Sequence, residues 1–186
     1  PEYDFSQGER GRYVGRVRSH ARVVVLDHDV ARAFPDDKAV NDVALSPDQT
    51  TLVTVGTDKY VRLWTFPELE PIETLQGHKN TVATVRFSPD GKLFATASAD
   101  TTVRVWDRAS GECLHTLKGH KRNVTSLTWV KGNTMLASSG LGDDIVLWKL
   151  PGGDRTDLVT GHKAAVTLGG LTPDGQRLIS AGYRFS

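Results

Sequence analysis

Three histidines recur at one spacing and are the residues of this sequence best suited to metal or acid–base chemistry. His78, His120 and His162 each follow a glycine, and each lies 42 residues from the next. An imidazole can bind a metal, move a proton or form buried hydrogen bonds. A zinc site needs several ligands within about 2 Å of one ion, whereas this spacing places the rings in different structural units. We therefore expect neither a metal site nor a catalytic centre at these histidines.

Three tryptophans have the same period, which extends the pattern from single residues to a repeated unit. Trp64, Trp106 and Trp148 are again 42 residues apart. A fixed period of this size is typical of one supersecondary unit that is copied and stacked, because a single copy cannot bury its apolar face alone. Function is therefore expected on the surfaces of the stack.

The unit that must position these residues is predicted to be a four-stranded β-sheet. In the middle copy, residues 81–88, 93–98, 102–106 and 112–117 have the alternation or the β-branched residues of strands. Turn residues such as those at 89–92 separate them. The pattern recurs on both sides, with no sustained helical period from about residue 41 onward.

Composition indicates an ordinary globular protein and gives no sign of an enzyme. The 186 residues carry a formal net charge of +1, with 24% charged residues, so no bulk charge favours nucleic acid or a membrane. The lone Cys113 allows no internal disulfide. The longest aliphatic run, residues 23–26, is far too short to span a bilayer. We predict a protein without enzymatic activity or cofactor, located in the cytoplasm, or in the nucleus of a eukaryote.

The repeated motifs resemble those of the WD40-repeat β-propeller family. The matching positions, which recur in phase between residues 35 and 183, are Gly77-His78, Ser88-Pro89-Asp90-Gly91, Ser98-Ala99-Asp100 and Trp106-Asp107. The resemblance implies an all-β fold of propeller blades with four antiparallel strands each. Blades at 42–75, 81–117 and 123–160, with two further strands, give about four blades' worth of strands in this chain. We expect an incomplete ring, or one that an oligomer completes.

The resemblance also implies a hydrogen-bonded chain inside each blade. In the family it joins the histidine, a serine or threonine of the second strand, an aspartate of the following turn and the tryptophan. The middle blade would use His78, Ser98, Asp100 and Trp106. The other blades carry part of the set, namely Asp58 and Trp64 in the first, His120 and Trp148 in the third, and His162 and Ser180 in the last. Because buried polar groups need partners, the middle blade should be the most rigid.

In this family, partners dock on the loops between blades and on the turns between the second and third strands. A lysine follows each Gly-His pair here, so neighbouring blades would present a rim of cations, or simply solvated loops. We expect a non-catalytic scaffold with an acidic protein or peptide partner, as a homo-oligomer or part of a larger propeller. The predicted contact residues are Lys38, Thr57, Lys79, Asn80, Ala99, Lys121, Arg122, Leu141 and Lys163.

Residues 1–41 match the repeat poorly and leave two interpretations open. Residues 13–34 can be aligned as strands of a partial blade that lacks the histidine and the tryptophan. Alternatively, segments between residues 2 and 41 resemble small bacterial antitoxin-like proteins, in which a strand precedes a short helix capped by Asp27. That alternative predicts a regulatory protein that binds a toxin or DNA through its N-terminal arginines.

Overall fold

The computed structural model describes residues 40–142, 144–159, 162, 165–172 and 177–183, which form fourteen β-strands. The strands are β1 (Val40–Leu45), β2 (Thr51–Gly56), β3 (Val61–Thr65), β4 (Pro71–Leu75), β5 (Val82–Phe87), β6 (Leu93–Ser98), β7 (Thr102–Asp107), β8 (Cys113–Lys118), β9 (Val124–Trp129), β10 (Met135–Gly140), β11 (Ile145–Lys149), β12 (Asp154–Val159), β13 (Ala165–Leu171) and β14 (Leu178–Tyr183). The described residues contain no helix, and therefore none that could span a membrane.

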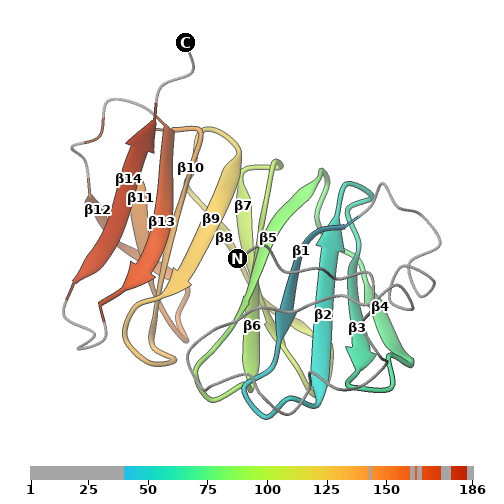
Figure 1. Ribbon diagram of the computed structural model, residues 1–186. Coiled ribbons are helices and arrows are strands. Elements are labelled where there is room, and N and C mark those ends of the chain that lie inside the picture. The colour runs from blue at the N-terminus through green and yellow to red at the C-terminus, as the bar shows by residue number, and fades with distance from the viewer. Residues whose placement is uncertain (1–39, 143, 160–161, 163–164, 173–176, 184–186) are drawn as a thin grey trace, which may run out of the picture.

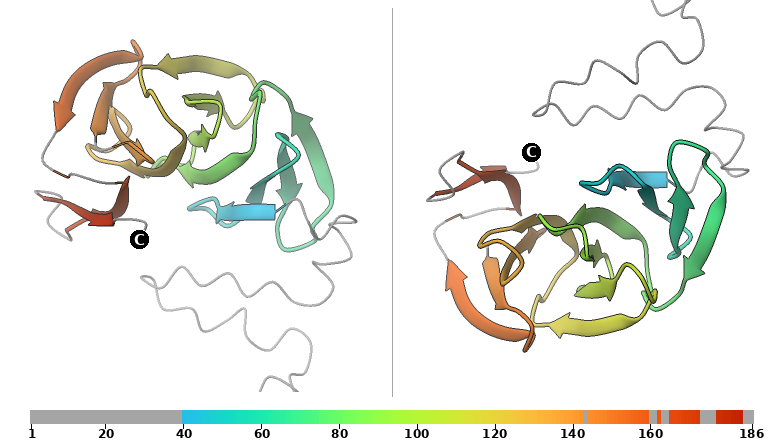
Figure 2. Two further views of the ribbon diagram at one scale, coloured as in Figure 1. Left: turned by 90° about the horizontal axis from the view of Figure 1, so that it is seen from above. Right: turned by 90° about the horizontal axis from the view of Figure 1, so that it is seen from below.

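The strands form three four-stranded antiparallel sheets and one two-stranded sheet, each in chain order. We call the sheets β1–β4, β5–β8 and β9–β12 blades 1, 2 and 3, and β13–β14 the two-stranded sheet. The first strands of all four sheets lie side by side (Figure 1). Seen from above or below, the blades follow an arc (Figure 2). The predicted all-β fold, with four-stranded blades in an incomplete ring, is confirmed.

Short turns join the first and second strands of blades 1 and 2 through the same hydrogen bonds. The hydroxyl of Ser46 donates to Asp48 Oδ1 over 2.6 Å, and that of Ser88 donates to Asp90 Oδ1 over 2.7 Å. Gly91 has a φ of +71°, which residues with a side chain rarely adopt. These turn residues allow the tight reversal between β5 and β6.

The hydrophobic core lies between neighbouring blades. Trp106 of blade 2 shares a buried cluster with Val61 and Leu63 of blade 1. Trp148 of blade 3 shares the next cluster with Val105 of blade 2. Since each sheet covers the apolar face of its neighbour, burial of apolar surface stabilises the stack more than any single sheet.

Polar side chains also join the first strands of successive sheets. Asp42 of β1 accepts hydrogen bonds from the Thr84 hydroxyl and the Val85 amide of β5, at 2.6 and 3.0 Å, and pairs with Arg86. Between β9 and β13, the amide of Leu168 donates to Ser126 Oγ over 2.9 Å. These contacts align the strands that line the inside of the arc.

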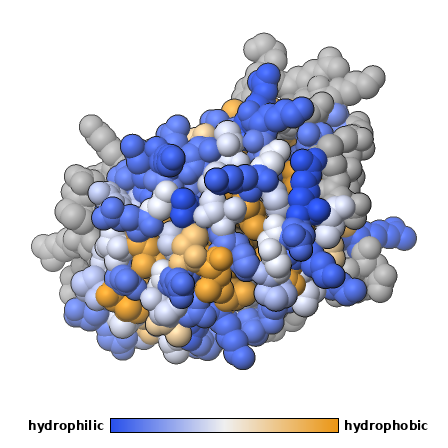
Figure 3. Space-filling model, turned by 180° about the vertical axis from the view of Figure 1, so that it is seen from behind, coloured by the Kyte–Doolittle hydropathy of each residue, from blue (hydrophilic) through white to orange (hydrophobic). Residues whose placement is uncertain are grey.

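The outer strands present a mixed surface. Seen from behind, hydrophobic side chains are scattered among hydrophilic ones (Figure 3). Ile72 of β4 and Leu114 of β8 are among the exposed large hydrophobic residues, at 52% and 42% exposure. Single exposed apolar residues are normal on a protein surface, so the outer rim gives no indication of a binding site.

The N-terminal interpretations concern a part of the chain outside the described residues. Strand β1 begins at Val40, two residues before the predicted start of the blades at residue 42. The predicted partial blade, the antitoxin-like helix at Asp27 and the contact residue Lys38 all precede it. They remain predictions.

Candidate functional site

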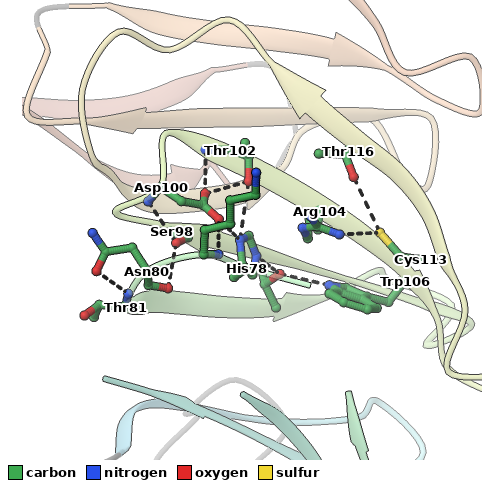
Figure 4. Close-up of polar contacts among 12 residues, drawn as sticks. His78, Asn80, Thr81, Ser98, Asp100, Thr102, Arg104, Trp106, Cys113 and Thr116 are labelled. Carbon is green, nitrogen blue, oxygen red and sulfur yellow. Dashed lines mark hydrogen bonds and ion pairs between the residues drawn. The ribbon is translucent and has the colours of Figure 1, made fainter. Parts of the chain in front are cut away.

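A chain of hydrogen bonds in blade 2 joins strands β6 and β7 to the loop before the blade and to the turn after β6 (Figure 4). His78 Nδ1 lies 2.9 Å from Asp100 Oδ2, and His78 Nε2 lies 2.8 Å from Thr96 Oγ1. The indole N–H of Trp106 donates to the same hydroxyl oxygen over 2.9 Å. Because a carboxylate can only accept, His78 carries its proton on Nδ1, and Nε2 accepts from Thr96. All donors in this chain, which we call the relay, therefore have acceptors.

The hydroxyl of the relay belongs to Thr96, which corrects the sequence-based assignment to Ser98. Ser98 Oγ donates to the Asn80 carbonyl and accepts from the Asp100 amide, both at 3.0 Å. Thr96 and Ser98 lie two residues apart, so they share one face of β6 and the strand pattern does not distinguish them. The 42-residue period does, since Thr54, Thr96, Ser138 and Ser180 are in register.

Asp100 ties the loop before blade 2 to the turn after β6. It accepts hydrogen bonds from the Lys79 amide at 2.8 Å, and from the Thr102 amide and hydroxyl at 2.9 and 2.6 Å. Burial raises the pKa of Asp100, but these bonds and the one from His78 outweigh it and hold the pKa well below its usual range. Asp100 is therefore a buried anion with its side chain only 7% exposed.

His78 stays neutral in this environment. Burial lowers its pKa, and the neighbouring Arg104 charge acts in the same direction. The hydrogen bond and charge of Asp100 oppose the shift but do not reverse it. A neutral, fully hydrogen-bonded imidazole with no exposed side-chain surface is suited to holding strands together, and it offers no free nitrogen to a metal or substrate.

Among the described residues, blade 3 has the relay without the carboxylate. His120 Nε2 and the Trp148 indole nitrogen each lie 2.7 Å from Ser138 Oγ. Gly142 occupies the position that Asp100 has in blade 2, and the neighbouring Asp143 lies outside the described residues. Burial, together with the charge of Arg155, lowers the pKa of His120 to about 4, although Asp144 opposes the shift.

Blade 1 and the two-stranded sheet have smaller parts of the relay. In blade 1 the Trp64 indole donates to Thr54 Oγ1 over 3.1 Å, and Asp58 pairs with Arg62 of β3. In the two-stranded sheet His162 Nε2 lies 2.9 Å from Ser180 Oγ. The structure thus completes the four-membered relay, as far as it is described, in blade 2.

The predicted contact residues lie on one face of the stack, which we call the loop face. It consists of the loops at 76–81 and 119–123 and the turns at 57–60, 99–101 and 141–142. Thr57, Lys79, Asn80, Lys121 and Arg122 are exposed there, whereas Ala99 and Leu141 are half-buried. Lys163 lies outside the described residues, as Lys38 does.

A hollow of about 410 Å³ opens on the loop face between blades 1 and 2. Its lining residues are Asp58, Lys59, Tyr60, Gln76, Gly77 and His78. Lys59 and Tyr60 are not among the contact residues predicted from the sequence, although both follow Asp58 in a turn predicted to belong to the binding surface. The Arg62 guanidinium lies 5.2 Å from the centre of the Tyr60 ring and supports it.

The described residues contain no group of three histidine, cysteine or acidic side chains that could hold a metal ion. Cys113 lies on β8, where Arg104 Nη1 is 3.5 Å from its sulfur. Figure 4 shows this pair beside Trp106, on the far side of the relay from Asp100. The chemistry of the loop face is therefore that of charge, hydrogen bonding and shape.

Comparison with known proteins supports the repeat pattern. The family model described as "WD domain, G-beta repeat" matches residues 30–65, 69–107 and 111–149. None of the curated proteins matches the sequence. The chain is similar in structure to U3-55K and to the WD40 repeats of RRP9, each with a TM-score of 0.68, 21% sequence identity and 72% of this chain covered. It covers 43% and 42% of those two chains, which at this identity indicates a shared fold.

Proposed function

Since the family model matches more than half of its residues, the chain belongs to the WD40-repeat family, and we propose that it is a scaffold that binds an acidic segment of a partner protein on its loop face. WD40 propellers are generally non-catalytic interaction scaffolds, and fold alone does not name a partner. The proposal rests on one contrast in the loop face. The acidic side chains of Asp58 and Asp100 are paired within the protein, whereas the basic side chains are exposed to solvent.

Two carboxylates of the loop face, Asp58 and Asp100, bond to groups of the protein itself. Asp100 accepts hydrogen bonds from His78, Thr102 and the Lys79 amide, and Asp58 pairs with Arg62. By contrast, the side chains of Lys59, Lys79, Lys121 and Arg122 are exposed. A surface that neutralises its anions internally and presents its cations to solvent favours an acidic partner.

The hollow between blades 1 and 2 is a concave site on this surface. Tyr60 is 36% exposed at its edge, and Lys59 lies beside it. An exposed tyrosine supported by Arg62 can contact an apolar side chain while neighbouring lysines bind carboxylates, and tyrosine is enriched at interface hot spots. We therefore propose that the partner segment inserts one side chain into the hollow.

The test reverses Lys59, Lys79 and Lys121 to glutamate together and measures binding of a fluorescein-labelled polyglutamate peptide by fluorescence anisotropy. We expect at least about a tenfold loss of affinity and a weaker dependence on salt, because three favourable charge pairs become repulsive. The matched control reverses Lys92, Lys131 and Lys149, three exposed lysines at the opposite ends of the strands. Equal losses in both triple variants, or no binding to the unaltered chain, would contradict the proposal.

Assembly and location form a separate part of the proposal. The arc of blades supports association with further propeller blades, either of a second copy or of a larger protein. The location that we propose is the cytoplasm. Light scattering on the chain tests the first case, for which a monodisperse monomer is the contradicting result.

A further inference from the structure

The side chain of Arg104 is a half-buried cation that pairs with no carboxylate among the described residues. Its Nη1 lies 3.5 Å from the sulfur of Cys113 (Figure 4), which is only a weak acceptor. Its Nε is buried and has no hydrogen-bond partner. A charge in such a position costs stability unless an anion lies near it.

The equivalent arginine of blade 1 has such an anion. Arg62 lies 42 residues before Arg104 and forms an ion pair with Asp58. The residue that corresponds to Asp58 in blade 2 is Asp100, whose carboxylate is bonded to His78 in the relay. The relay therefore uses the carboxylate that the arginine has in blade 1, and Arg104 is left without a counter-charge of its own.

The guanidinium of Arg104 lies against the hollow between blades 1 and 2. Gly77 lines this hollow. A Cβ atom at Gly77 would lie 2.6 Å from Arg104 Nη1 and 3.0 Å from its Cζ, so the absence of a side chain lets the charge approach this closely. The charge also reaches His78, another lining residue. Burial, together with the charge of Arg104, lowers the pKa of His78, although Asp100 opposes the shift.

The other groups of the hollow add to this positive charge. Lys59 and Gln76 are exposed lining residues with N–H groups that can donate hydrogen bonds. Asp58 also lines the hollow, but its charge is already paired. Since Lys59 and Arg104 have no counter-ion among the described residues, the hollow has an excess of positive charge that favours an anionic group.

We propose that the side chain which the acidic partner inserts into the hollow is a glutamate, and that Arg104 selects it. The methylene groups of the glutamate pack on the ring of Tyr60. Its carboxylate lies near Lys59 and Gly77, where the charge of Arg104 stabilises it. Arg104 acts across Gly77 and determines specificity without touching the ligand. This inference rests on the proposed function and names the group that enters the hollow.

The experiment uses the full chain and a fluorescein-labelled polyglutamate peptide with an amidated C-terminus, which excludes binding through a terminal carboxylate. Arg104→Met removes the charge and keeps a side chain next to the Trp106 ring, which lies 5.9 Å from Arg104 Cζ. Arg104→Lys keeps the charge. The matched control is Arg155→Met, since Arg155 Nη1 would lie 3.6 Å from a Cβ atom at Gly119, the glycine equivalent to Gly77 in blade 3.

We expect Arg104→Met to weaken the peptide by about five- to tenfold in anisotropy titrations. The factor should be nearly the same in about 0.15 M and 0.5 M salt, because a half-buried charge is screened little. Arg104→Lys should keep most of the affinity, and Arg155→Met should change it by less than about twofold. The midpoint of thermal unfolding should not fall in Arg104→Met, because the buried nitrogen without a partner is removed.

Three results would overturn the inference. They are unchanged binding by Arg104→Met, equal losses in Arg104→Met and Arg155→Met, and equal losses in Arg104→Met and Arg104→Lys. In the unaltered chain the peptide should also shift the NMR signals of the Tyr60 and Gly77 amides, and signals that do not move would exclude the hollow. All these outcomes leave the proposed function intact, because polyglutamate would then bind through the exposed lysines alone. Absence of any peptide binding would contradict the proposed function itself.

Discussion

Blades 2 and 3 share a histidine, a hydroxyl and a tryptophan at equivalent positions, but they differ at the fourth member. In blade 2 the carboxylate of Asp100 bonds to His78 and to the backbone of Lys79. In blade 3 the equivalent residue is Gly142. The comparison shows that the histidine, hydroxyl and indole are sufficient to build the blade, whereas the aspartate connects the blade interior to the loop face.

This difference bears on binding, because the loop residues that the aspartate orders are the proposed contact residues. Lys79 follows His78 directly and is held by its amide, while Lys121 follows His120 without such a carboxylate among the described residues. An ordered loop loses less conformational entropy when a partner binds. Blade 2 should therefore contribute more to partner affinity than blade 3.

The largest effect is expected from Asp100→Ala, which removes the member that blade 3 lacks. The free energy of unfolding should fall by about 2–3 kcal/mol, because the buried His78 and two amides lose their acceptor. Chemical denaturation followed by tryptophan fluorescence measures it. Asp58→Ala is the control in blade 1, where the ion pair with Arg62 is partly exposed and a loss below about 1 kcal/mol is expected. Equal losses of unfolding free energy in the two variants would contradict the claim that the carboxylate of Asp100 stabilises its blade more than that of Asp58 does.

Acid should then affect His120, which has no carboxylate hydrogen-bonded to its ring among the described residues. The pKa of His120 is lowered to about 4, below the value of about 6.5 in an unfolded chain. The neutral ring therefore stabilises the folded state fully above pH 6.5, and this contribution is lost as the pH falls toward 4.

Denaturation between pH 7 and 4.5 should show a loss of about 2–3 kcal/mol in the free energy of unfolding, which His120→Gln reduces. Asp100 contributes little to this window, because a carboxylate with a lowered pKa loses its stabilising effect only below about pH 4. An unchanged pH profile in His120→Gln would show that His120 is not the titrating group.

The smallest expected effect is an increase in stability, when a carboxylate replaces Gly142 at the position equivalent to Asp100. A Cβ atom at Gly142 would meet no atom within 4 Å, so the position has room for the start of an aspartate side chain. We expect a stabilisation of about 0.5–1 kcal/mol and a higher pKa of His120, both measurable by denaturation and NMR titration. Gly142→Asn is the neutral control, and identical effects of the two substitutions would mean that the charge does not reach His120.

The sequence predicted the blades because a 42-residue period and strand alternation act within each copy. The prediction of strand 102–106, for instance, differs by one residue from β7. It misplaced the relay hydroxyl because Thr96 and Ser98 share a strand face. The 42-residue register and the hydrogen bond from Trp106 distinguish the two residues. The hydrogen bonds between Asp42 and β5 were not predicted, because they depend on how two blades pack and no local sequence pattern encodes them.

The most direct test of this account is amide hydrogen exchange at the two equivalent loop lysines. After correction for intrinsic rates, the Lys79 amide should exchange at least about tenfold more slowly than the Lys121 amide, because it donates to Asp100. Asp100→Ala should remove the difference. Equal rates in the unaltered chain, or a difference that persists in Asp100→Ala, would contradict the claim that the carboxylate of blade 2 orders the loop face.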